Sequence, residues 1–166
     1  MVTRSYQTDE LTVHWDAQRC IHTGICLRAL PEVFDSARRP WVRIDNAPTD
    51  AIVAAVEKCP TGALRYERDG VPETGPAETT MVPIPNGPLL VRGRLRVVGA
   101  TGAVLAEETR LTLCRCGQSQ NQPFCDNSHR RVGFDEAPPQ PVNRQREEAE
   151  SPADVCPPQD FDAPSP

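Results

Sequence analysis

The sequence predicts an α+β protein built from two small units and a disordered acidic tail. Three observations support this fold class. Strand-like and helix-like patterns follow one another in residues 1–68, strand-like patterns dominate residues 82–134, and prolines and acidic residues fill residues 135–166. The chain has 166 residues, 38% of them hydrophobic and only 5% aromatic, which is little apolar material for one large core. Small domains with thin cores usually need a metal or a disulfide for stability.

The first unit, residues 1–68, is predicted to contain three strands and two helices. Leu11, Val13 and Trp15 alternate with polar residues in LTVHWD, which is the pattern of a half-buried strand. The stretch TGICLRALPEVF predicts a short helix that stops at Pro31, because proline cannot continue a helix. We expect WVRID to form a second strand, PTDAIVAAVEKCP an amphipathic helix and GALRYER a third strand.

The second unit is predicted to be mainly β. Residues 69–81 are rich in Gly, Pro and Thr and lack apolar periodicity, so they are expected to form a linker. Residues 82–134 then show two strands around a glycine-containing turn, running directly into the string CRCGQSQNQPFCDNSH. The cysteines of this unit are therefore expected at the end of a strand and in the loop that follows it.

The composition also limits the tail and the compartment. Residues 135–166 hold eight prolines and eight acidic residues against two arginines, so this tail cannot bury enough apolar surface and is predicted to be disordered, with Cys156 alone in it. No apolar run approaches membrane-spanning length and no secretory signal pattern is present, so a cytoplasmic protein is expected. Disulfides are rare there, and the seven cysteines are therefore interpreted first as metal ligands.

The string that starts at residue 114 contains four candidate ligands with the spacing C-x-C-x8-C-x3-H: Cys114, Cys116, Cys125 and His129. The one-residue spacing of the first pair lets two thiolates reach one metal from a strand end. The second pair is four residues apart, which predicts one face of a helical turn, opened by Pro123 and supported by Asp126. Three thiolates and one imidazole suit either a structural zinc or an iron–sulfur cluster.

The full string resembles the CDGSH signature of the mitoNEET-like proteins, C-x-C-x2-[S/T]-x3-P-x-C-D-G-[S/A/T]-H. Its elements are present as Cys114, Cys116, Ser119, Pro123, Cys125, Asp126, Ser128 and His129. The single departure is Asn127, where the family has glycine, and asparagine tolerates left-handed backbone angles well enough for the loop to survive. The resemblance implies a [2Fe–2S] cluster, with Cys114 and Cys116 on one iron and Cys125 and His129 on the outer iron. It leaves open whether the chain forms a homodimer, as mitoNEET-like proteins do.

Three further cysteines form a second motif, C-x5-C followed at a distance by C-P: Cys20, Cys26 and Cys59. Bacterial ferredoxins have C-x2-C-x2-C and a distant C-P, so Thr23 stands where the middle cysteine would be. Residues 9–68 resemble the divergent single-cluster 4Fe–4S ferredoxin domain, which implies a small ferredoxin-like α+β domain.

The missing fourth cysteine leaves the nuclearity of this first cluster open. Three thiolates hold a [3Fe–4S] cluster completely, or a [4Fe–4S] cluster whose fourth iron finds another ligand. The adjacent His22 could supply that ligand, although a lone neighbouring histidine is more often solvated. The alternative is that the three cysteines are buried without a metal, because free cysteine is commonly buried.

The predicted function is electron transfer by a small protein that carries two different iron–sulfur clusters. No Ser-His-Asp arrangement, P-loop, dinucleotide fingerprint or acid–base carboxylate pair is present, so the chain is not expected to be an enzyme. A histidine ligand raises the potential of a [2Fe–2S] site, so electrons are expected to run from the first domain to the second. The expected partner is a reductase or an oxygenase, and neither nucleic acid nor a membrane.

Two alternatives come from other classes of function. The chain could be a cluster carrier or redox sensor that gives its [2Fe–2S] cluster to an apo-acceptor, or it could be a zinc-stabilised interaction module. A basic rim around the second site could dock an acidic partner, and it would comprise Arg92, Arg94, Arg96, Arg110, Arg115, Arg130 and Arg131.

Overall fold

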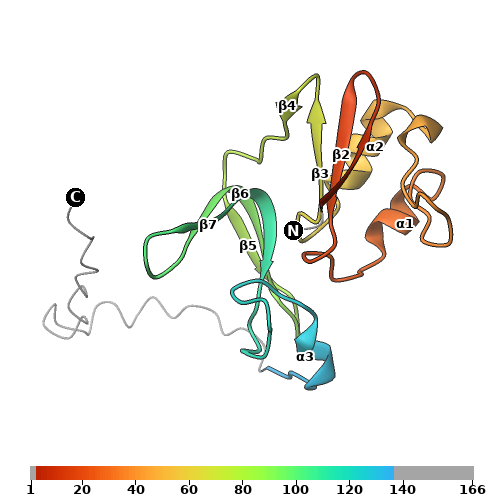
Figure 1. Cartoon of the computed structure of the whole chain (residues 1–166). Coiled ribbons are helices and arrows are strands. Elements are labelled where there is room, and N and C mark those ends of the chain that lie inside the picture. Colours follow the sequence, from red (N-terminus) through yellow and green to blue (C-terminus); the bar gives the residue numbers. More distant parts are fainter. Residues whose placement is uncertain (1–2, 137–166) are drawn as a thin grey trace, which may run out of the picture.

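The computed structural model describes residues 3–136, which form two antiparallel sheets with short helices (Figure 1). The first sheet has the strand order β1-β2-β3-β4, and the second has the order β5-β6-β7. The predicted α+β class is therefore confirmed. From residue 137 on, the tail that was predicted to be disordered lies outside the described residues, and so does Cys156.

The first sheet is built around β2 (Leu11–Asp16), which pairs on one side with β1 (Thr3–Gln7) and on the other with β3 (Leu64–Arg68). A two-residue strand, β4 (Val71–Pro72), extends the edge beside β3. Strands β2 and β3 were predicted from their sequence patterns. Strand β1 was not, because four of its five residues are exposed and it carries no apolar alternation; Tyr6 alone is partly covered.

Two α-helices and a 3-10 turn cover one face of this sheet: α1 (Ile25–Ala29), η1 (Ile44–Asn46) and α2 (Thr49–Val56). Both helices lie where the sequence predicted them. The core between helices and sheet contains Leu11, Val13, Val33, Phe34, Val42, Ile52, Val56 and Leu64, each at most 2% exposed. Nearly all of the fully buried apolar side chains of the described residues therefore belong to this unit.

The prediction of a strand at WVRID is wrong. Val42 makes only an isolated bridge to Phe34, and Ile44 begins the 3-10 turn η1. Both side chains are buried, at 1% and 4% exposure, and this alternating burial produced the strand-like pattern. Alternation reports which side chains face the core and does not require a neighbouring strand.

The second sheet consists of β5 (Thr80–Pro83), β6 (Leu89–Val98) and β7 (Val104–Leu113). Strands β6 and β7 form the predicted pair around a glycine-containing turn, and their register shifts between Arg92 and Leu95. Strand β5 was not predicted, since all four of its residues are exposed. The segment predicted to be a linker therefore carries β4 and the first residues of β5.

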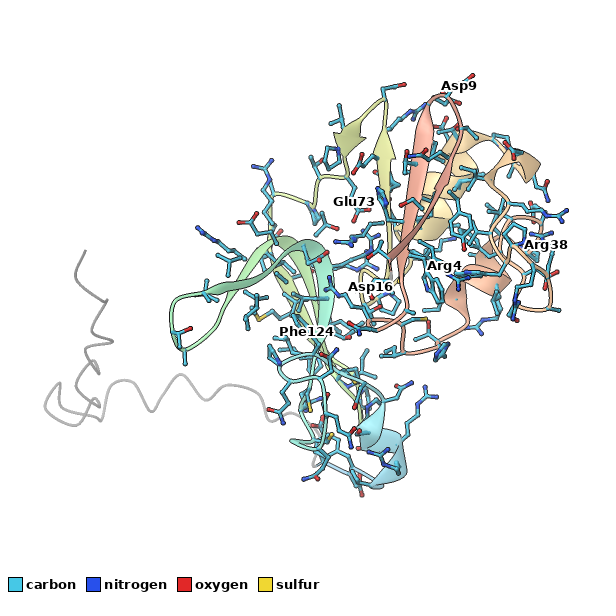
Figure 2. The ribbon with its side chains drawn as sticks, in the orientation of Figure 1. Arg4, Asp9, Asp16, Arg38, Glu73 and Phe124 are labelled. Carbon is cyan, nitrogen blue, oxygen red and sulfur yellow. The ribbon has the colours of Figure 1, made fainter. Side chains whose placement is uncertain are left out.

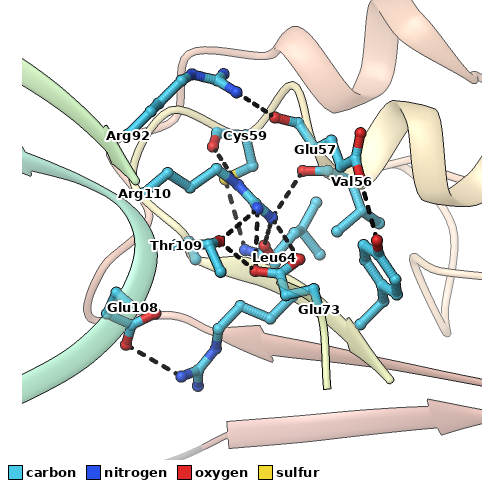
Figure 3. Close-up of polar contacts among 12 residues, drawn as sticks. Val56, Glu57, Cys59, Leu64, Glu73, Arg92, Glu108, Thr109 and Arg110 are labelled. Atoms are coloured by element: carbon cyan, nitrogen blue, oxygen red, sulfur yellow. Dashed lines mark hydrogen bonds and ion pairs between the residues drawn. The ribbon is translucent and has the colours of Figure 1, made fainter. Parts of the chain in front are cut away.

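The two sheets meet at a polar contact centred on Arg110 of β7 (Figure 3). Arg110 is 4% exposed. Its guanidinium donates to three main-chain carbonyls of the first unit, those of Cys59 (2.9 Å), Val56 (3.2 Å) and Leu64 (2.8 Å). It also pairs with the carboxylate of Glu73, at 2.9 and 3.1 Å. Glu73 lies between the two sheets in Figure 2. This buried ion pair thus joins the two units.

Within residues 3–136, no helix is both long and apolar enough to cross a membrane. The cytoplasmic location stays a prediction.

Candidate metal centres

The first half of the CDGSH-like set lies at the end of β7. Cys114 follows the last residue of that strand and Cys116 lies in the next loop, with 3.7 Å between their sulfur atoms. The loop folds back on itself because the Cys114 amide donates to the carbonyl of Pro123 at 2.9 Å. The Ser119 hydroxyl closes it further by donating to the Phe124 carbonyl at 2.6 Å. The two thiols are therefore held side by side, as the predicted pair requires.

The second half is the pair Cys125 and His129, with 3.4 Å between the cysteine sulfur and the imidazole Nδ1. Both residues are buried, at 4% and 8% exposure. Only His129 belongs to a helix, α3 (Ser128–Arg131), because Asn127 before it has the left-handed angle φ 73°. The expected helical turn through both ligands, opened by Pro123, is therefore wrong. The left-handed residue bends the chain so that Cys125 still meets His129.

Asp126 ties this turn to the preceding loop. Its carboxylate accepts hydrogen bonds from the amides of Ser128 and Gln120, both at 2.9 Å. These backbone donors hold the pKa of Asp126 well below its usual range. The predicted bond from Asp126 to a free amide at the start of the helix is thus present.

The pKa shifts of Cys114 and His129 favour the deprotonated forms that bind metal, and the shift of Cys125 does not. Burial raises the pKa of Cys125, and Cys114 and Cys116 raise it further, as expected for thiols that share a site. Burial acts to raise the pKa of Cys114. Hydrogen-bond donors including the Ser119 amide outweigh it, so the pKa of Cys114 is lowered overall. Burial and the neighbouring Arg130 lower the pKa of His129, which favours the neutral imidazole. Metal ligands must be deprotonated, so Cys114 and His129 are poised for that role.

The first set of cysteines lines a cavity of about 500 Å³. Cys20 lies in the loop after β2, Cys26 in α1 and Cys59 after α2, and all three are half-buried. Burial raises the pKa of Cys26, and the neighbouring Cys59 and Cys20 raise it further. The amide of Leu64 points at the Cys59 sulfur at 3.5 Å. The structure therefore brings together three thiols from distant parts of the unit.

His22 and Thr23 line the same cavity. The imidazole Nδ1 of His22 lies 3.8 Å from the Cys20 sulfur, and the residue has the left-handed angle φ 53°. The Thr23 hydroxyl is instead directed at the amide of Ile25, at 3.5 Å. Of the two residues beside Cys20 that could supply a fourth ligand, His22 is the better placed.

Trp15 and Trp41 also line this cavity. The sequence predicted only that each lies in a strand. Their rings meet edge to face with 5.1 Å between centroids. Neither indole N–H has a hydrogen-bond partner among the described residues. Nothing in the local sequence could have shown this, because the two residues come together only when residues 41–44 fold back over the sheet.

The predicted basic rim is wrong for one member, Arg110, because its side chain is buried against the first unit. Two further members are already engaged: Arg92 donates to the Glu57 carbonyl at 3.2 Å, and Arg115 pairs with Glu136. Arg96 pairs with Glu107 at 3.4 Å on the exposed surface. A docking role for the rim therefore depends mainly on the exposed Arg94 and Arg130, and on Arg131, which is exposed but donates to the Ser128 hydroxyl at 3.0 Å.

The donor sets fit iron–sulfur binding. Within residues 3–136, no group of three or more His, Cys, Asp or Glu side chains is placed to hold a single metal ion. The second set instead consists of two pairs, and the first of three thiols around one cavity. Thiolates with an occasional imidazole are the donors that hold iron–sulfur clusters.

Comparison with known proteins agrees with both motifs. Residues 6–69 match the family described as divergent 4Fe-4S mono-cluster, and residues 86–130 match the family described as iron-binding zinc finger, CDGSH type. The chain is also 32% identical over 63 residues to the uncharacterized protein YjdI of Escherichia coli, in strains K12 and O157:H7. That match covers 38% of this chain and 83% of YjdI. Both resemblances read from the motifs are confirmed: the chain belongs to the divergent 4Fe-4S mono-cluster family and carries a CDGSH iron-binding domain after that unit.

Proposed function

We propose that this iron–sulfur protein transfers electrons through two clusters of different type. The second site would hold a [2Fe–2S] cluster, and the first a [3Fe–4S] or [4Fe–4S] cluster. The observation that carries the proposal is the grouping of the donors into two separate sets, one of two close pairs and one of three thiols. When bound, such clusters supply one-electron redox chemistry.

The paired geometry supports two irons at the second site. Cys114 and Cys116 form one pair with 3.7 Å between sulfur atoms, and Cys125 and His129 form the other at 3.4 Å. Each pair can hold one iron. The second pair is the more buried, and the bond from the Cys114 amide to the Pro123 carbonyl fixes the loop of the first pair.

The first site offers three thiolates and the nearby imidazole of His22. Three thiolates complete a [3Fe–4S] cluster. In a [4Fe–4S] cluster, the candidate ligand of the fourth iron is His22, whose Nδ1 lies 3.8 Å from the Cys20 sulfur. With thiolates as its main proposed donors, this site should have the lower potential, because each thiolate adds negative charge that disfavours reduction of the cluster. Electrons would then enter at the first site and leave from the second. We propose no catalytic role for either site, and a cytoplasmic reductase or oxygenase as the partner.

Iron and sulfide analysis of the full chain, purified anaerobically, tests this proposal. About five or six irons per chain are expected, and EPR should show a [2Fe–2S] signal beside that of a larger cluster. Changing Cys20, Cys26 and Cys59 to Ser should remove only the larger cluster. A content of two irons in the unmodified protein would eliminate the first site, and a colourless zinc protein would eliminate both.

The same protein separates electron transfer from cluster delivery. An electron carrier reduces a reductase-coupled acceptor and keeps its iron. A carrier of clusters would lose its [2Fe–2S] absorption when mixed with an apo-acceptor, with iron appearing in the acceptor.

A further inference from the structure

Asn127 links the two ligand sets directly. Its backbone amide donates to the sulfur of Cys125 at 3.4 Å, and its side-chain Nδ2 donates to the carbonyl of Ile21. Ile21 is 7% exposed and is bonded covalently to Cys20. A chain of covalent bonds and two hydrogen bonds thus runs from a ligand of the first site to a ligand of the second, across 106 positions of sequence.

A second contact flanks this link. The guanidinium of Arg19, next to Cys20, lies 5.2 Å from the ring centre of Phe124, next to Cys125. Arg19 also pairs with Glu108 of β7, and the two side chains are 11% and 6% exposed. Figure 2 shows Phe124 at the side of the second unit that faces the first. Residues on both sides of Cys20 therefore touch residues on both sides of Cys125.

We infer that Asn127 is a positioning residue that clasps the second ligand loop to the first and sets the distance between the two sites. The left-handed angle φ 73° at this position would suit glycine equally well. The backbone alone therefore does not account for an asparagine, whereas the bond to Ile21 requires a side-chain donor. The side-chain amide of Asn127 makes this hydrogen bond, and its acceptor belongs to Ile21, the residue next to Cys20.

The consequence for electron transfer rests on the proposed function. The clusters that the two ligand sets would hold would supply one-electron exchange, in which the electron lost at the first site is gained at the second with no bond made or broken. An external one-electron donor, such as a reduced flavoprotein, would refill the first site. The clasp keeps the distance for this step constant.

Amide hydrogen exchange of the full-length protein tests the clasp without reference to its clusters. Asn127→Gly keeps the left-handed backbone and removes the donor, and Asn127→Asp keeps the size but places an acceptor against the Ile21 carbonyl. Loss of one hydrogen bond should accelerate exchange in segments 19–25 and 124–131 roughly three- to tenfold. Asn86→Gly is the matched control, because Asn86 is also left-handed, with φ 52°, but contacts Glu136 instead of the first unit. Unchanged exchange in either Asn127 variant would overturn the inference.

EPR of the fully reduced protein tests the distance between the sites. The wild-type protein should show magnetic interaction between the two clusters, and Asn127→Gly should weaken it at unchanged iron content, while Asn86→Gly should not. An identical interaction in Asn127→Gly would overturn the role of Asn127 in setting the distance. A wild-type protein with only one paramagnetic centre would instead overturn the proposed function, and the exchange result would still decide the clasp.

Discussion

At the residue scale, the second site depends on side chains that a motif names but does not explain. His129 is buried at 8% exposure, and its lowered pKa favours the neutral imidazole. The Asp126 carboxylate holds the turn before it through two amide bonds. The ligand loop is therefore organised by its own backbone donors, in addition to any metal.

Replacing His129 with cysteine tests its assignment as a ligand. The change puts a thiolate in place of a neutral imidazole, and the added negative charge beside the iron stabilises the oxidised cluster. The reduction potential of the [2Fe–2S] site should fall on the order of 100 mV or more, with the visible spectrum shifted. Redox titration of the full chain measures this.

The matched control is His14→Cys, since His14 lies in β2 and contacts only Ser5 and Glu67 among the described hydrogen bonds. Equal potentials in wild type and His129→Cys would show that His129 does not bind the iron.

At the element scale, the loop after α2 must pass very close to β7. Gly62 in this loop has φ 66°, and a Cβ atom there would lie 2.6 Å from the main-chain carbonyl oxygen of Arg110. That oxygen belongs to a strand and cannot move aside cheaply. The glycine of the CPTG sequence is therefore required by the contact between the units as well as by its own backbone angle.

Gly62→Ala should consequently lower the free energy of unfolding far more than Gly70→Ala. Both glycines have left-handed angles, but no described atom lies within 4 Å of a Cβ at Gly70. The backbone penalty of about 1–2 kcal/mol applies to both variants. The clash adds roughly 1–3 kcal/mol at Gly62 alone. Equal denaturation midpoints for the two variants would mean that the loop and β7 do not touch.

The end of α2 is joined to β3 by the bond from the Tyr66 hydroxyl to the Glu57 carboxylate, at 3.0 Å. Burial raises the pKa of Tyr66, and Glu57 raises it further. A raised pKa means that the stabilisation is complete below the unfolded pKa of about 10 and is lost as pH rises through the folded pKa.

Tyr66→Phe should therefore be less stable than wild type at pH 8, by about 0.5–1.5 kcal/mol. The difference should shrink above pH 10, because the ionised tyrosine repels Glu57. Urea midpoints measured from pH 8 to 11 check this. A difference that stays constant over this range would contradict the assigned bond.

At the scale of the whole molecule, buried ion pairs join the two units, and the pair of Arg110 with Glu73 is one of them. Arg110 of β7 and Glu73 after β4 have side chains only 4% and 7% exposed. The same guanidinium satisfies three carbonyls of the first unit, including that of Cys59 (Figure 3). A residue of the second unit thus supports the main chain at a candidate ligand of the first.

Arg110→Met should destabilise the protein by about 3–5 kcal/mol, because Glu73 would remain buried without its partner. Arg96→Met is the control, since the exposed pair of Arg96 with Glu107 contributes at most about 1 kcal/mol. Adding Glu73→Gln to Arg110→Met should recover part of the loss. Thermal unfolding of the full chain measures all three, and equal losses for Arg110→Met and Arg96→Met would show that the units do not share this ion pair.

The sequence by itself determined the α+β class, helices α1 and α2, the strands with a buried face and the types of the candidate ligands. The apolar–polar alternation in LTVHWD and the ligand spacing in CRC and CDNSH are local properties, because each pattern spans only a few residues. The motifs therefore identified both families before any contact was visible.

Only the tertiary structure decided the rest. Strands β1 and β5 are almost fully exposed, so no apolar pattern marked them, and the buried alternation around Val42 imitated a strand. The burial of Arg110 depends on the approach of Leu64, which is 46 residues away. The bond from Asn127 to Ile21 joins residues that are 106 positions apart. The sequence does not show whether a charged or amide side chain contacts water or another loop, because the packing of distant segments determines its partner.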